Sequence, residues 1–483
     1  ECESKKCEEP NPYSKISNSC APADYIAPEP DPEPIPQPIP KPLPPATMPA
    51  KEVRGLIYFI DEKSKVIPLA LAKVVFEYDD PQGVHHEDPN FFVWTDKDGK
   101  FSWSNSTVFA PGNKIDVLLS YEDQQGRAKI VTDSSSLFYL GRNISAEDNV
   151  WSNFEKNLDN WDSKALAKIY VNVIKAVDFS KNVFNSPQEL EEVRAFSQIG
   201  TSHLDEIYSG GSNVVGMRIE NSDSYFPNPE APTNREFHEY CHHIQATILK
   251  EKRIPLGNDH GGYFNNPDSE WGLIEGWAEF CALQMKKYYK TGTPWIYEYG
   301  SSQANLEMNY VLGANKKRSN DEEFAIAGIL LDLTDSTSDY GNHDDDFVSI
   351  PLSEVWKAFS EKRDFSDGKG IRGVYNLHDL YSALKEVTTD NIALHDVPVA
   401  DNVSNFDRLF IMHGAFQDVN LDKKWNLGET VGLSGRGVLE REEVKPEPGT
   451  ELIFNIKQPF GVELTTGLLA NVVVQIDAPN DYL

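Results

Sequence analysis

The residues with the clearest chemistry are two histidines four positions apart in the segment REFHEYCHH, residues 235–243. Side chains at positions i and i+4 of a helix lie on one face, so His238 and His242 can bind one metal ion together. Imidazole nitrogens suit Zn²⁺, which lowers the pKa of a bound water molecule toward 7. Glu239 stands beside the ligands and is placed to take a proton from that water. The pattern predicts a catalytic zinc site, and a histidine-rich polar helix face is the alternative.

A second acidic motif follows in the segment EWGLIEGWAEF, residues 270–280. Glu275 can supply a third ligand, which would complete the His₂Glu set of catalytic zinc hydrolases. Glu279 lies one turn later on the same face and could accept the second N–H of a zinc-bound histidine. Two solvated helix carboxylates are the alternative, but apolar neighbours such as Trp277 and Phe280 indicate that this helix is buried.

The elements that must position these side chains are mainly helical. Apolar residues at helical spacing predict helices over residues 162–176, 187–199, 234–249, 270–289, 322–333, 352–360 and 377–386. One predicted strand, residues 213–219, precedes the first motif, and an extended substrate could pair with it along a sheet edge. We therefore expect residues 141–415 to form a mainly α domain.

The region before the helices has the pattern of a β-module. The short alternating segments GLIYFI, AKVVFEY, FFVWT, KFSWS and KIDVLLSY are separated by turn residues such as Asp98-Gly99. Residues 51–140 are therefore predicted to form a β-sandwich. The preceding residues, 1–50, are rich in cysteine and proline, and proline at every second position of residues 28–44 predicts an extended spacer.

Oxygen-bearing residues after the helical region have the spacing of the ligands in an EF-hand calcium loop. The ligand positions are occupied by Asp418, Asn420, Asp422, the backbone carbonyl of Lys424, Asn426 and Glu429. Lys423 stands where such loops have glycine, and an acidic surface turn is the alternative. We expect a structural Ca²⁺ here, with a C-terminal β region completing residues 416–483. The fold class is thus multidomain α+β: an N-terminal β-sandwich, a central mainly α domain and a C-terminal β region.

The two motifs together resemble those of a family. HEYCH followed by EGWAEF is similar to the gluzincin metallopeptidases, and locally to the thermolysin and fungalysin sequences. Secreted, uncharacterised gluzincin-like proteins share further features in a fixed order along the chain: a β-module, HEYGH, a loop with two glycines, EGWA and one more helix. In this chain the loop contains Gly261-Gly262, and residues 329–335 resemble the last helix. The β-module resembles a carboxypeptidase-regulatory or transthyretin-like sandwich. The resemblance implies a zincin-like domain with the metal between two motif helices.

The chain departs from the family pattern at two positions. Cys241 replaces a small residue before the second histidine, and Leu331 stands where those sequences tend to have tryptophan. A disulfide between Cys241 and Cys281 would join the two ligand-bearing helices, and two buried thiols are the alternative.

The group that would stabilise the oxyanion is less evident from the sequence. In related gluzincins a histidine or tyrosine from a later segment has this role. Tyr340 and His343 are the candidates here, and the alternative is that each is an ordinary loop residue.

The composition of the chain indicates its cellular compartment and which binding partners are excluded. With 45 Lys and Arg against 76 Asp and Glu, the net charge of −31 argues against nucleic acid and anionic membrane surfaces as partners. The crowded cysteines of the tail favour disulfides in an oxidising compartment: Cys2, Cys7 and Cys20. Three sequons are compatible with glycosylation, although such sequons also arise by chance: Asn105, Asn143 and Asn402. The chain starts at Glu1 without methionine, from which we expect a removed secretion signal.

These inferences predict a secreted, zinc-dependent peptidase that acts on a peptide or protein substrate. The alternative is an extracellular filament or surface-scaffold protein, built on a peptidase-like fold and assembled through its N-terminal tail or terminal β regions. No apolar segment is long enough to predict a transmembrane helix.

Overall fold

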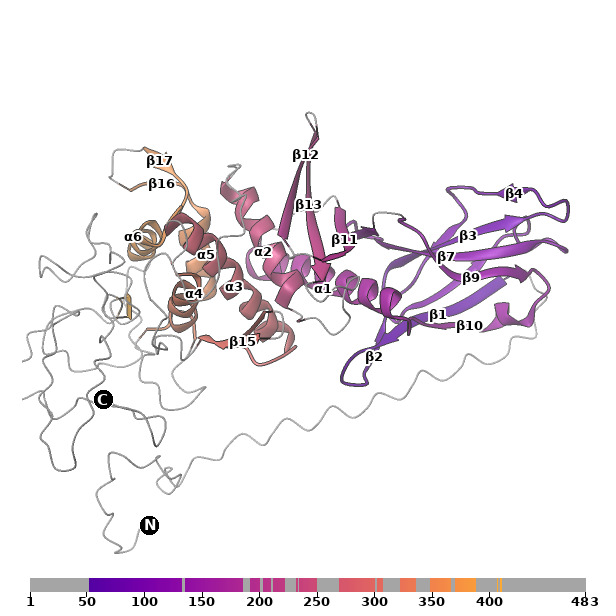
Figure 1. The fold of residues 1–483 in the computed structure, drawn as a ribbon, viewed down its shortest axis with the longest axis horizontal. Coiled ribbons are helices and arrows are strands. Elements are labelled where there is room, and N and C mark those ends of the chain that lie inside the picture. The colour runs from indigo at the N-terminus through magenta and orange to yellow at the C-terminus, as the bar shows by residue number, and fades with distance from the viewer. Residues whose placement is uncertain are drawn as a thin grey trace, which may run out of the picture.

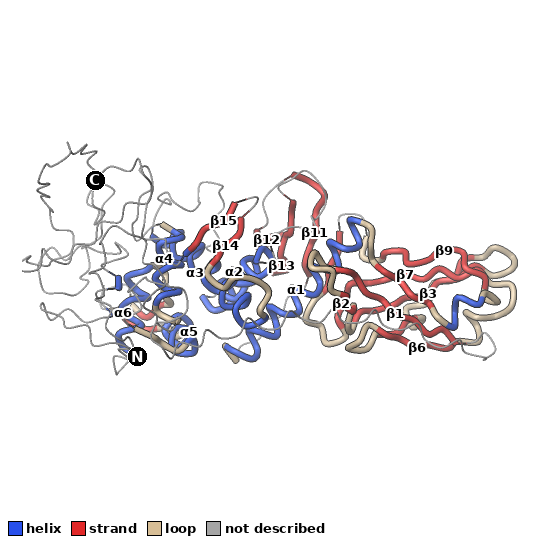
Figure 2. Tube along the Cα trace, turned by 90° about the horizontal axis from the view of Figure 1, so that it is seen from below, coloured by secondary structure: helices blue, strands red, loops and turns tan. Residues whose placement is uncertain are grey.

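The computed structural model describes residues 52–132, 135–185, 192–199, 203–209, 212–221, 232, 234–249, 269–299, 302–306, 322–335, 348–365, 370–387, 406 and 409–410. The described elements form an elongated arrangement, with a β-rich region at one end and a helical region at the other (Figures 1 and 2). This confirms the multidomain α+β class.

The β-rich region is built from two sheets that enclose an aromatic and aliphatic core. Its elements are β1 (Glu52–Ile60), β2 (Val66–Pro68), β3 (Ala72–Asp79), β4 (His85–His86), β5 (Phe92–Trp94), β6 (Lys100–Ser104), β7 (Lys114–Asp123), β8 (Lys129–Thr132), β9 (Phe138–Ser145), the 3-10 helix η2 (Asn149–Ser152) and β10 (Phe154–Asn157). Strand β1 pairs with β2, β6 and β10 in a four-stranded sheet. Buried residues alternate along β3, where Val74 and Phe76 face the core, as expected for a strand with one covered face. The five predicted strands are confirmed as β1, β3, β5, β6 and β7.

The second sheet continues from the β-rich region into the helical region. Its path runs β12-β13-β11-β8-β7-β3-β4, with β5 beside β3 and β9 beside β7. The three strands added in the helical region are β11 (Glu192–Ile199), β12 (His203–Ser209) and β13 (Ser212–Asn221). Parallel pairing of β11 with β8 makes the connection. The two regions therefore share one sheet.

The helix predicted over residues 187–199 is wrong, because residues 192–199 form β11. Val193 and Ala195 are buried while Glu192 and Arg194 are partly exposed, which is the two-residue period of a strand. A short apolar run is ambiguous between helix and strand, and here parallel pairing with both β8 and β13 decides it.

The predicted strand before the first motif is confirmed as β13, but its predicted open edge is not. Strand β13 lies between β11 and β12, and both sides of its backbone are paired. Among the described strands β12 is the terminal one on this side of the sheet. An extended peptide would therefore have to pair with β12 rather than β13.

Six of the seven predicted helices are confirmed. The helices are α1 (Trp161–Val183), α2 (Asn234–Leu249), α3 (Ser269–Tyr289), α4 (Glu323–Asp332), α5 (Leu352–Ser360) and α6 (Leu377–Val387), accompanied by the hairpins β14 (Ile296–Tyr299) with β15 (Ser302–Asn305) and β16 (Arg363–Asp364) with β17 (Ile371–Arg372). Helix α1 begins after Asn160, whose side chain accepts a hydrogen bond from the Ser163 N–H at 2.8 Å. Within the described residues, no helix is both long and apolar enough to cross a lipid bilayer.

Helix α3 is fixed between α2 and α4 (Figure 1). A Cβ atom at Gly276 would lie 2.7 Å from both the Glu323 carbonyl oxygen and the Ile326 Cβ, so the close approach of α3 and α4 requires glycine. Towards α2, a disulfide joins Cys241 to Cys281, with their Cα atoms 6.2 Å apart. The predicted link between the two motif helices is thus present.

Several predictions fall outside the described residues. These are the cysteines and proline spacer of residues 1–50, Tyr340, His343, the Gly261-Gly262 loop, Asn402, the calcium loop of residues 418–429 and the C-terminal β region. Of the other two sequons, Asn143 is exposed and has a backbone φ of 52°. The Asn105 side chain accepts a hydrogen bond from the Thr107 N–H at 2.9 Å. Glycosylation at these asparagines remains a prediction.

Candidate metal centre

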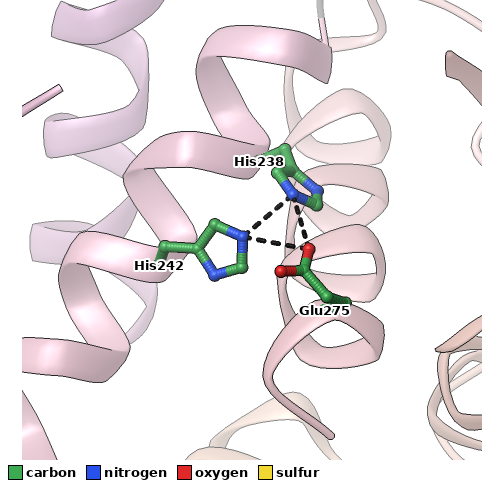
Figure 3. Close-up of side chains that lie close together, drawn as sticks. All are labelled: His238, His242 and Glu275. Carbon is green, nitrogen blue, oxygen red and sulfur yellow. Dashed lines mark hydrogen bonds and ion pairs between the residues drawn. The ribbon is translucent and has the colours of Figure 1, made fainter. Parts of the chain in front are cut away.

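The two motif helices bring their predicted ligands together. His238 and His242 on α2 point toward Glu275 on α3, as Figure 3 shows. The two Nε2 atoms are 3.0 Å apart, and Glu275 Oε2 lies 3.3 Å from that of His238 and 3.2 Å from that of His242. Around a tetrahedral Zn²⁺ with bonds of about 2.0–2.1 Å, neighbouring ligand atoms are ~3.3 Å apart. The three donors therefore fit one metal ion, which confirms the predicted grouping.

The third ligand is a buried carboxylate whose charge is held by the imidazoles. Glu275 is 7% exposed, and burial by itself would raise the pKa of its carboxyl. The charges and hydrogen bonds of His242 and His238 outweigh burial and hold that pKa well below its ordinary value. In the metal-free site Glu275 consequently stays anionic.

A tyrosine that sequence reasoning missed completes the surroundings of His238. The Tyr297 hydroxyl on β14 lies 2.8 Å from His238 Nδ1, the ring nitrogen that faces away from Glu275. A metal on Nε2 requires the imidazole proton to be on Nδ1, from where it can be donated to the tyrosine oxygen. Burial, followed by the charges of Glu279 and Glu239, raises the pKa of Tyr297, so the phenol remains neutral.

Strand β14 is anchored by polar contacts on both sides of Tyr297. The Asn234 side chain at the start of α2 donates to the Glu298 carbonyl oxygen at 2.6 Å. The Lys286 ammonium group on α3 donates to the Ile296 carbonyl oxygen at 2.9 Å and pairs with the Glu298 carboxylate at 3.2 Å. Both motif helices therefore hold the strand that places the phenol against His238. No local motif marks this role, because it depends on a contact between β14 and α2.

The two remaining predicted carboxylates lie near the site in different surroundings. Glu239 is buried, and its charge acts on Tyr297. Glu279 is also buried, and its carboxyl is hydrogen-bonded to that of Glu323 on α4. Burial raises the pKa of Glu279 well above its ordinary value, and the charges of Glu323, Glu322 and Glu275 raise it further. At His238 the atom next to Nδ1 is the Tyr297 oxygen, and the N–H acceptor role of Glu279 remains a prediction.

The helices and contacts described above define a buried His-His-Glu group that suits a metal ion. The comparisons add no relative: the chain matches no protein-family model and no curated protein. The interpretation of this site therefore depends on its own geometry.

Proposed function

We propose that this chain is a zinc-dependent peptidase, in which His238, His242 and Glu275 hold the ion and Glu239 is the general base. The observation that carries this proposal is the mutual spacing of the three ligand atoms at 3.0–3.3 Å. Two neutral imidazoles and one carboxylate are the donor set of catalytic zinc hydrolases. Such a set leaves a coordination position for water or substrate, unlike the four protein ligands of a structural zinc site.

The chain's own residues have distinct roles in this proposal. Zn²⁺ held by the triad would lower the pKa of a water molecule and polarise the scissile carbonyl group. Glu239 takes the proton from the attacking water and delivers it to the leaving amine. Glu275 offsets part of the ion's charge, while Tyr297 fixes the ring orientation of His238. The disulfide between the motif helices supports an oxidising compartment, and we propose that the peptidase is secreted.

Replacing the general base tests the proposal directly. Glu239→Gln should retain zinc, because the substitution leaves the three ligands in place, and should lower the rate of peptide hydrolysis about 10²–10⁴-fold. Zinc content can be measured by elemental analysis, and hydrolysis with casein and a fluorogenic peptide library. Glu386→Gln is a matched control, because Glu386 is an exposed residue of α6 that pairs with Arg363 at 3.8 Å.

The outcomes separate the two functions considered for this chain. Wild-type hydrolysis in the Glu239→Gln variant would refute the assignment of the general base. A wild-type chain that binds zinc tightly but cleaves no peptide would instead favour an inactive scaffold built on a peptidase-like fold.

A further inference from the structure

A second group of metal-ligating side chains lies in the β-rich region. Strands β3 and β4 pair with Asp79 opposite His85, and β3 pairs with β7 so that Glu77 is opposite Asp116. Side chains two positions apart on a strand share a face, so Glu77 and Asp79 lie on one side of the sheet with these partners. Strand β4 is at the far end of the β-rich region from α2 and α3 (Figure 1). This group is therefore independent of the His238 centre.

Three donor atoms of this group converge. His85 Nε2 lies 3.2 Å from Glu87 Oε1 and 3.7 Å from Glu77 Oε2, and the three atoms lie within 4.8 Å of one another. The other ring nitrogen, Nδ1, is 2.7 Å from Asp79 Oδ1. A carboxylate that accepts the Nδ1–H turns Nε2 outward as a ligand, which is the usual arrangement around a metal-bound histidine.

Among the described residues, the cationic partner of the Glu77 carboxylate is the His85 imidazole, at 3.7 Å. Glu77 is 8% exposed, and its carboxylate accepts no hydrogen bond from the described residues. Lys114 stands opposite Asp79 in the register of β7, but it forms no ion pair with this group within the described part of the chain. A buried carboxylate beside other carboxylates is stabilised when a divalent ion joins them.

We infer that His85, Glu77 and Glu87 form a second site for a divalent transition-metal ion, with Asp79 orienting the imidazole. One imidazole nitrogen and two carboxylate oxygens suit Zn²⁺ and neighbouring ions better than Ca²⁺, which prefers six to eight oxygens. An ion there would tie Glu87, in the segment that follows β4, to Glu77 on the face of β3 opposite to Val74 and Phe76. Its role is structural, since the site lies far from the His238 centre.

Zinc stoichiometry of the full-length chain tests this inference. Metal-stripped protein is dialysed at pH 7.5 against buffered free Zn²⁺, and bound zinc per chain is measured by elemental analysis. His85→Ala and Glu77→Gln should each lose one zinc equivalent relative to the wild type. His86→Ala is the matched control: His86 pairs with Asp80 at 3.1 Å and stacks on Tyr78, so uptake should not change.

The same measurement separates this site from the proposed catalytic one. His242→Ala should lose the zinc equivalent bound at the His238 centre. The double variant His85→Ala with His242→Ala should lose both zinc equivalents. Peptide hydrolysis should be unaffected in His85→Ala, so failure of either proposal is visible without the other. Equal zinc uptake by the wild type, His85→Ala and Glu77→Gln across the range of free Zn²⁺ would overturn the second site.

Discussion

The contact between Tyr297 and His238 gives a prediction that involves a single oxygen atom. Tyr297→Phe removes the hydroxyl that lies 2.8 Å from His238 Nδ1 and leaves the ring, which packs edge-on against Phe324 at 6.0 Å. Without zinc, the imidazole can change its tautomer to suit the new surroundings. With zinc on Nε2 the proton must be on Nδ1, where it loses the tyrosine oxygen. The cost therefore falls on the metal-bound state.

The magnitude follows from the known cost of such changes. Loss of a group that orients a metal ligand weakens metal binding about 10–100-fold, which corresponds to ~1.4–2.8 kcal/mol. A buried N–H that loses a hydrogen bond costs about 1–3 kcal/mol, which is the same range. We therefore expect the zinc Kd of Tyr297→Phe to rise about 10–100-fold, with a much smaller change in unfolding free energy of the metal-free chain.

Competition with a chromogenic chelator at constant pH measures this change. Tyr289→Phe is the matched control, because Tyr289 on α3 donates its hydroxyl hydrogen to the Lys175 carbonyl oxygen at 2.8 Å, away from the ligands. That variant should lose some stability while its zinc Kd stays at the wild-type value. Equal zinc affinity in Tyr297→Phe and the wild type would refute the orienting role, and equal weakening in both variants would point to a general loss of structure.

Two further predictions concern the core. Replacing Cys241 and Cys281 together by serine should lower the free energy of unfolding by about 4 kcal/mol, the loop-closure term for a separation of 40 residues, and an unchanged urea midpoint would contradict it. Burial raises the pKa of Tyr121, Tyr170 and Tyr289 above the ordinary value of about 10, so the folded state keeps protons that the unfolded state loses. The free energy of unfolding should therefore fall as pH rises above 10, by up to ~1.4 kcal/mol per pH unit for each tyrosine. In a pH titration, the phenolate absorbance of these residues should appear only as the circular dichroism of the folded state is lost.

The ligand triad could be predicted from the sequence because its information is local. His238 and His242 share a helix face by their spacing alone, and α2 has the predicted bounds. Glu275 required a second helix, and the apolar residues around it indicated that this helix would be buried. What the sequence did not provide was the distance between the two helices.

The parts that were missed depend on pairing between distant segments. Residues 192–199 have an apolar spacing that fits a helix, and only the strands on either side make them β11. Tyr297 lies in a four-residue strand whose pairing and contacts with Asn234 and Lys286 have no short-range signature. Likewise Glu77 and His85 come together through the register of β3 and β4, which alternation of apolar residues does not specify.

The spacing of the ligands is set by packing that needs no ion. Cys241 lies between the two histidines in sequence, and its disulfide to Cys281 fixes α2 against α3. Next to Glu275, Gly276 lets α3 approach α4, and Trp277 stacks on Phe359 of α5 with ring centroids 4.0 Å apart. Neighbours of each ligand are thus held in the core, so binding an ion requires little ordering of the backbone. This is why a change at Tyr297, which alters one ring's hydrogen bond but none of these helix contacts, should act on metal affinity rather than on the fold.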